Sequence, residues 1–162
     1  MSIVTEQSPL PSRHAVRSLL EGLTGRDIDF RDGDPIPPKP TNTIAVFVTD
    51  KLATSAIAVV TLEGAARLGG SLGMLPKGGV DDAIDTKDLY SPIKENCYEV
   101  LNVLSAVFNV PDAPHVKLYQ MYGPGEAVPS DIAQLAATLG SRMDIAFTIA
   151  GYGDGHLSLV VR

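Results

Sequence analysis

Cysteine is nearly absent from the sequence: Cys97 is the only one in 162 residues, so an internal disulfide is excluded. Proteins of the cytoplasm seldom carry disulfides, whereas small secreted domains often depend on them. The N-terminal residues MSIVTEQSPLPSR also lack the basic start and the long apolar run of a secretory signal peptide. We therefore expect a cytoplasmic protein.

Long apolar runs and clusters of positive charge are missing as well. The apolar runs IAVFV and SAIAVV are far shorter than the roughly 20 residues that cross a bilayer, so no transmembrane segment is expected. The net charge is −6, and no block of consecutive lysines or arginines is present to bind phosphate backbones or anionic lipids. The composition therefore argues against nucleic acid and membrane surfaces as partners.

Three kinds of catalytic or cofactor motif are also absent. His14, His115 and His156 are scattered, and no HExxH or CxxC pair accompanies them, so no metal site is expected. No GxSxG sequence marks a nucleophilic serine. The glycine-rich stretch GGSLGMLPKGG lacks the GxxxxGK[ST] spacing that binds phosphates through backbone amides. We therefore expect this chain to bind neither a metal nor a cofactor.

Apolar residues are plentiful, at 44% of the chain, which is enough for one sizeable core. We expect a single domain over residues 1–162, with a flexible start at 1–12.

Helical spacing is found at 13–23, 63–72, 92–108 and 129–140. Strand patterns predict a short edge strand before a proline-rich loop within 27–42, a hairpin over 44–48 and 55–62, a strand at 115–123, and a final hairpin over 143–162 that turns at Asp154 and Gly155. Residues 81–89 read as an acidic connector, and the whole predicts an α+β fold with helices packed on one face of a largely antiparallel sheet.

The helix expected at 92–108 has two different sides. At about 100° per residue, one side collects the apolar residues Ile93, Cys97, Val100, Leu101, Leu104 and Phe108, and the other collects Glu95, Glu99, Asn102 and Ala106. Glutamate on an exposed helix face is explained by solubility alone. Asn102 is less easily explained, because asparagine inside a helix costs about 0.5 kcal/mol relative to alanine. The periodicity leaves two interpretations open, a solvated face or a surface that contacts a partner.

The sequence Glu99-Val100-Leu101-Asn102 gives this face a family context. An E-x-x-N motif on the polar side of this helix, with the elements in this order from Arg13 to Arg162, resembles the CheC/CheX/FliY family of response-regulator phosphatases, and especially its CheX-like branch. The helix at 63–72 carries no second asparagine motif, as in that branch. The resemblance implies a CheX-like α+β domain that removes phosphate from the phospho-aspartate of a CheY-like receiver domain.

The resemblance also assigns roles to residues. Asn102 would hold a water in line with the phosphorus, and Glu99 would pair with the receiver's lysine. Glu95 and Ala106 would lie in the partner-binding surface; the family often has aspartate or serine at the first position and glycine at the second. Mg²⁺ would be held by the receiver's own carboxylates. Because an acyl phosphate is already reactive, positioning of the water is the main catalytic requirement, and a carboxamide meets it.

Two other functions remain open from the sequence. A CheX-like domain can bind a partner or form a homodimer through its sheet without hydrolysing anything. The runs IAVFV and SAIAVV would permit such a dimer, but a sheet core explains them equally well. A small-molecule-binding domain that uses the glycine-rich loop at Gly78 and Gly79 is the third possibility. A deep apolar pocket at that loop, with Glu99 and Asn102 covered, would favour the third.

Overall fold

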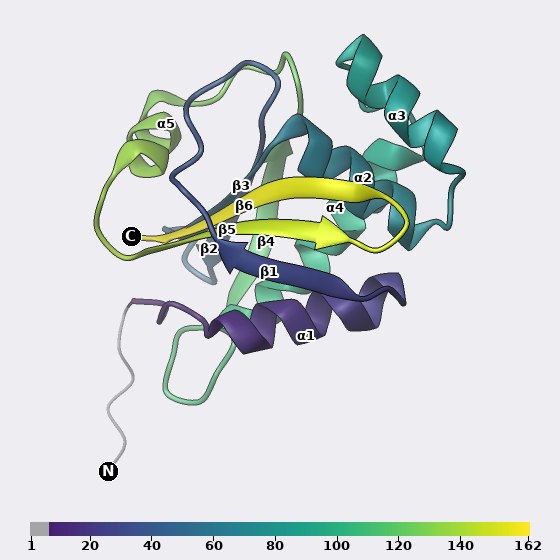
Figure 1. The fold of residues 1–162 in the computed structure, drawn as a ribbon. Coiled ribbons are helices and arrows are strands. Elements are labelled where there is room, and N and C mark those ends of the chain that lie inside the picture. Colours follow the sequence, from purple (N-terminus) through teal and green to yellow (C-terminus); the bar gives the residue numbers. More distant parts are fainter. Residues whose placement is uncertain (1–6) are drawn as a thin grey trace.

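The computed structural model describes residues 7–162, and its centre is a six-stranded antiparallel sheet (Figure 1). The order across the sheet is β1-β5-β6-β3-β2-β4, so β1 and β4 form its edges. The strands are β1 (Ile28–Asp32), β2 (Thr43–Thr49), β3 (Thr54–Val60), β4 (Val116–Tyr122), β5 (Arg142–Ile149) and β6 (Gly153–Val161). The helices are α1 (Arg13–Thr24), α2 (Leu62–Leu72), α3 (Lys77–Thr86), α4 (Ile93–Leu104) and α5 (Ser130–Ala137), with a short 3-10 helix at Ser105–Phe108. The predicted α+β class and antiparallel sheet are confirmed.

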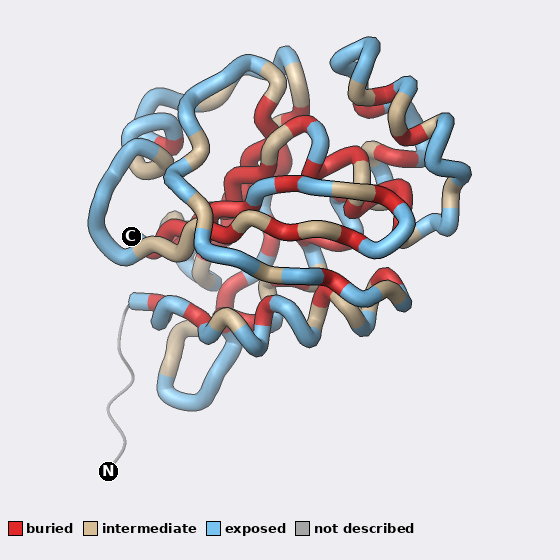
Figure 2. Tube along the Cα trace, in the orientation of Figure 1, coloured by how far each residue is buried: buried red, intermediate tan, exposed pale blue. Residues whose placement is uncertain are grey.

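Strands β2 and β3 are buried on both faces, which explains their nearly continuous apolar sequences (Figure 2). One face of the sheet packs with α1, α2 and α4 into the main core, as expected. On the other face, α5 and the proline-rich segment cover a smaller apolar cluster that includes Val46, Ile57 and Ile132. The segment that carries α5 is thus an additional element on the second face of the sheet.

The end of α5 is fixed by Arg142. Its guanidinium donates to the carbonyl oxygens of Ala136 (3.0 Å) and Thr138 (2.7 Å) and pairs with Asp144 (2.9 Å). Ser158 donates a further hydrogen bond to the Asp144 carboxylate. The guanidinium and the carboxylate therefore satisfy each other inside the protein, where an unpaired charge would be costly.

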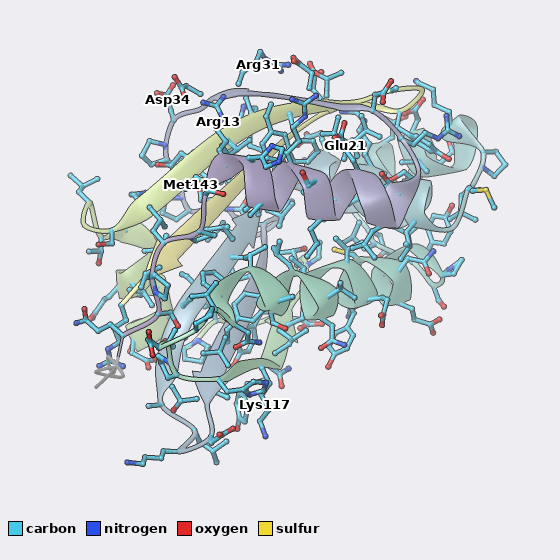
Figure 3. All side chains as sticks on the ribbon, turned by 90° about the horizontal axis from the view of Figure 1, so that it is seen from below. Arg13, Glu21, Arg31, Asp34, Lys117 and Met143 are labelled. Carbon is cyan, nitrogen blue, oxygen red and sulfur yellow. The ribbon has the colours of Figure 1, made fainter. Side chains whose placement is uncertain are left out.

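Helix α1 and strand β1 are joined at one edge of the molecule. Arg13 pairs with Asp32 at 2.7 Å, and the Glu21 carboxylate accepts a hydrogen bond from the backbone N–H of Ile28 at 2.9 Å. Figure 3 shows Arg13 and Arg31 on this side and Lys117 of β4 on the opposite side. The first six residues of the expected flexible start lie outside the described residues. Within the rest of that start, Ser8 is buried and hydrogen-bonded to Ser55 (2.6 Å), so this part is packed against the fold.

The acidic connector expected at 81–89 is wrong, because residues 77–86 form α3. Val80 and Ala83, three residues apart, are buried among the aspartates, and Val80 packs against Gly70 of α2. The turn expected at Asp154 and Gly155 is wrong as well. Strands β5 and β6 are joined by residues 150–152, where Tyr152 N–H donates to the carbonyl of Ile149.

Candidate functional site

The candidate site lies on α4, which packs between α2 and the edge strand β4. No side chain caps the first turn of this helix, because Pro92 rather than Ser91 occupies the capping position. Backbone bonds serve instead: Lys94 N–H donates to the carbonyl of Tyr90 (3.0 Å) and Asn96 N–H to that of Pro92 (2.9 Å). The helix after Leu104 tightens into the 3-10 turn at Ser105–Phe108, so the segment predicted as one helix is two consecutive helical types.

The apolar side of α4 is buried as predicted, and it includes Ile93, Cys97, Val100, Leu101 and Leu104. The ring of Phe108 packs against Phe47 of β2, with ring centroids 5.5 Å apart. Burial raises the pKa of the Cys97 thiol to about 12. Because only a thiolate is a strong nucleophile or metal ligand, Cys97 acts as a small apolar residue of the core.

The polar side of α4 faces solvent. Glu95, Glu99, Asn102 and Ala106 are all exposed, so the two residues of the motif lie together on an open surface with their two predicted neighbours. Within residues 7–162, the side chains of Glu95, Glu99 and Asn102 make no hydrogen bond or ion pair. Two carboxylates and one carboxamide on this face are therefore available to a partner.

Beside this face lies a groove of about 470 Å³ between α4 and β4. It is lined by Lys94, Glu95, Tyr98, Tyr119, Gln120, Met121 and Glu126. Lys94 pairs with Glu126 at 2.7 Å, and this hydrogen bond, together with one from Gly123 N–H, lowers the pKa of the Glu126 carboxyl. The two tyrosines were not recognised from the sequence as part of a site. The exposure of Tyr98 was visible in the helical pattern, whereas the place of Tyr119 beside α4 depends on how β4 pairs with β2.

The described residues give no support to the other kinds of site considered above. Across the described part of the chain, no three His, Cys, Asp or Glu side chains come together to hold a metal ion. No helix there is long and apolar enough to cross a membrane. Gly78 and Gly79 lie in the first turn of α3, and the exposure of Glu99 and Asn102 is the opposite of what the small-molecule hypothesis required. An apolar cleft of about 490 Å³ exists between residues 35–40 and α5, but it lies on the other face of the sheet from α4.

Comparison with known proteins defines the fold. No protein-family model matches the chain, and no curated protein matches its sequence. A chain of the CheX–CheY–BeF3–Mg²⁺ complex from Borrelia burgdorferi matches with a TM-score of 0.55 and 10% identity, over 91% of this chain and 93% of that chain. CheX from Vibrio vulnificus matches with a TM-score of 0.52 and 10% identity, over 92% of this chain and 95% of that chain. The middle domain of FliM from Vibrio alginolyticus matches with a TM-score of 0.56 and 10% identity, over 91% of this chain and 86% of that chain. The chain thus has the fold that CheX and the FliM middle domain share, which confirms the fold implied by the resemblance.

Proposed function

We propose that the protein is a CheX-like phosphatase that hydrolyses the phospho-aspartate of a CheY-like receiver domain in a chemotaxis or other two-component pathway of the cytoplasm. The observation that carries the proposal is that Glu99 and Asn102 are exposed together, without side-chain partners, on α4. A relative of the same fold is found in a complex with CheY, BeF3 and Mg²⁺. An open helix face is what a catalyst needs when its substrate is buried in another protein's active site.

In this proposal Asn102 enters the receiver's active site and holds the attacking water. Its amide oxygen accepts a hydrogen bond from the water, and its amide nitrogen donates to the phosphoryl group or to the water oxygen. The water oxygen then attacks phosphorus while the bond from phosphorus to the aspartyl oxygen breaks, which gives aspartate and inorganic phosphate. The water protons pass to phosphate and solvent. Because the leaving carboxylate is a weak base, no general acid is required from this chain.

Mg²⁺ belongs to the partner in this proposal. It would be held by the receiver's carboxylates and would neutralise charge on the phosphoryl oxygens. This chain would therefore contribute the carboxamide and the docking surface, and none of the metal ligands.

Glu99 supplies the docking contact one turn before Asn102. Its free carboxylate would pair with the lysine of the receiver and fix the register of α4 in the active site. An exposed ion pair contributes only about 0.2–1 kcal/mol, so its main effects would be on orientation and on the rate of association. Glu95 would add charge of the same sign, and the small Ala106 would let the receiver approach the end of the helix closely.

A homodimer stays a prediction. The runs that suggested it lie in β2 and β3, which are interior strands covered on both faces, and burial explains their composition. A dimer that extends the sheet would have to use an edge strand, β1 or β4. Because β4 lies beside α4, a dimer through β4 would also occupy part of the proposed docking surface.

The test is the decay of phosphorylated receivers. Each receiver domain encoded in the same genome is phosphorylated with a small-molecule phosphodonor and Mg²⁺, the donor is removed, and the loss of phosphate is followed with and without this protein. We expect accelerated decay for at least one receiver, with multiple turnovers per molecule of this protein. Unchanged decay for every receiver would show that the protein is not a phosphatase of this kind.

A further inference from the structure

The groove between α4 and β4 adjoins the proposed docking surface. On α4, Tyr98 lies three residues after Glu95 and four before Asn102, so these three side chains follow one line along the helix. The opposite wall of the groove is β4, from which Tyr119 reaches it. A receiver that places its active site over Asn102 would therefore also cover this groove.

Tyr119 lies in a bulge of the edge strand. Strand β2 pairs Val46 with Gln120 and Phe47 with Leu118, so no residue of β2 lies opposite Tyr119. The bulge keeps Leu118 and Met121 buried on either side while Tyr119 and Gln120 are exposed. Bulges in edge strands commonly redirect a side chain near a functional site. Here the residue left without a partner on β2 is a large aromatic one that is 58% exposed.

The charge of the groove selects the kind of group that fits it. Its one cation, Lys94, is already paired with Glu126 at 2.7 Å, whereas the Glu95 carboxylate has no partner among the described residues. The groove therefore carries a net negative charge beside two exposed tyrosine rings. The faces of aromatic rings attract cations, and the alkyl stems of lysine and arginine pack well on such rings. An anionic or purely apolar group would match only part of this surface.

We propose that this groove binds a lysine or arginine side chain of the receiver domain, with its stem between Tyr98 and Tyr119 and its charged end at Glu95. The contact is separate from the pair between Glu99 and the receiver's active-site lysine. It rests on the proposed function in one respect, because it takes the partner to be a receiver domain. Its role is to select among receivers, since those without a basic residue at this position would bind more weakly.

The test measures binding and turnover separately. Receivers from the same genome are activated with BeF3 and Mg²⁺, which permits binding without hydrolysis, and their dissociation constants are measured for the parent and for single variants. Tyr98→Leu and Tyr119→Leu keep apolar bulk but remove the ring, whereas Tyr98→Phe and Tyr119→Phe keep it. We expect each leucine variant to weaken binding by between about twofold and thirtyfold and each phenylalanine variant to bind like the parent. The maximal dephosphorylation rate at saturating receiver should stay unchanged in all four.

Tyr90→Leu is the matched control. Tyr90 is 40% exposed, close to the 42% of Tyr98, but it does not line the groove, and its hydroxyl donates a hydrogen bond to the carbonyl oxygen of Gly79 in α3. Thermal unfolding of every variant identifies losses that come from misfolding. Glu95→Lys should weaken binding, and replacing one basic surface residue of the receiver with glutamate should restore it. That rescue identifies the receiver residue in the groove.

The outcomes separate this proposal from the phosphatase activity. If a receiver is dephosphorylated and both leucine variants bind it like the parent, the groove proposal is wrong and the phosphatase proposal stands. If a receiver binds and the leucine variants weaken it, but no dephosphorylation occurs, the groove proposal stands and the phosphatase proposal is wrong. If no activated receiver binds at all, both are wrong.

Discussion

Gly69 of α2 lies against Ile93 of α4 so closely that a Cβ atom on Gly69 would be 2.4 Å from the Ile93 carbonyl oxygen. The side-chain amide of Asn96 donates to the Gly69 carbonyl oxygen at 3.1 Å, which ties the two helices together at the same level. The position of α4, and with it the exposed face that carries Asn102, therefore depends on a residue without a side chain in α2.

Gly69→Ala should destabilise the protein, because the new methyl group overlaps a backbone oxygen that cannot rotate away. We expect a loss of about 1–3 kcal/mol in the free energy of unfolding, measured by urea denaturation. Gly22→Ala is the control, since Gly22 is an exposed helical residue of α1, and a Cβ atom there would meet nothing within 4 Å apart from the adjoining backbone of its own helix. That variant should gain about 0.4–1 kcal/mol. Equal effects of the two substitutions would show that the contact between α2 and α4 is looser than described.

Much of this fold was predictable because its signals are local. The apolar runs of β2 and β3 and the two-sided pattern of α4 were read correctly, since burial on both faces or on one face leaves a direct mark on the sequence. Helix α3 was missed because its few buried residues, such as Val80, stand among aspartates that suggest a loop. The turn before β6 was misplaced because Gly155 is required for packing: a Cβ there would lie 2.5 Å from the Gly64 Cα and 2.6 Å from the Phe147 ring.

The site was predictable only in part, and for a physical reason. Helical periodicity placed Glu99 and Asn102 on one exposed face, because neighbours on a helix are set by spacing along the chain. Tyr119 was not assigned to the site, because it comes from β4, which lies far from α4 in the sequence and reaches the groove only through its pairing with β2. Which strand lies beside which helix depends on contacts between distant segments, and the alternation within one strand does not reveal it.

The Cys97 thiol should be inert in the folded protein. Burial raises its pKa from 9.0 to about 12, so the unfolded chain loses the thiol proton at lower pH than the folded one. Between pH 9 and about 12 the folded state therefore binds more protons than the unfolded state. The free energy of unfolding should consequently fall as the pH rises through this range. Cys97→Ala should be less stable at neutral pH, because it leaves a small cavity, but should lose this contribution to the pH dependence.

Two measurements check this account of Cys97. Labelling by a thiol reagent should be slow for the native protein and should accelerate through the urea unfolding transition. The alkaline pH dependence of unfolding is compared between the parent and Cys97→Ala. Rapid labelling of the native protein at pH 8 would mean that the thiol is accessible and that its burial in α4 is wrong.

Glu99 should affect association more than chemistry. Glu99→Gln removes one exposed charge and should raise the KM for the phosphorylated receiver by up to about fivefold, with little change in kcat. Glu99→Lys should have a larger effect that weakens at high salt, because it sets like charges against each other. Asp85→Lys on α3 makes the same change in net charge on an exposed residue outside the groove and serves as the control. Equal effects of Glu99→Lys and Asp85→Lys would mean that only net charge matters.

The role of Asn102 is the central claim, and the most direct measurement is the kcat for dephosphorylation of a receiver by the parent and by Asn102→Ala. The exposed Asn102 side chain has no partner among the described residues, so this variant should fold and bind the BeF3-activated receiver like the parent. Its kcat should fall roughly 100-fold, because the attacking water loses its positioning group. Gln134→Ala, which removes an exposed carboxamide from α5 on the other face of the sheet, should leave kcat unchanged. An Asn102→Ala protein as active as the parent would contradict the account.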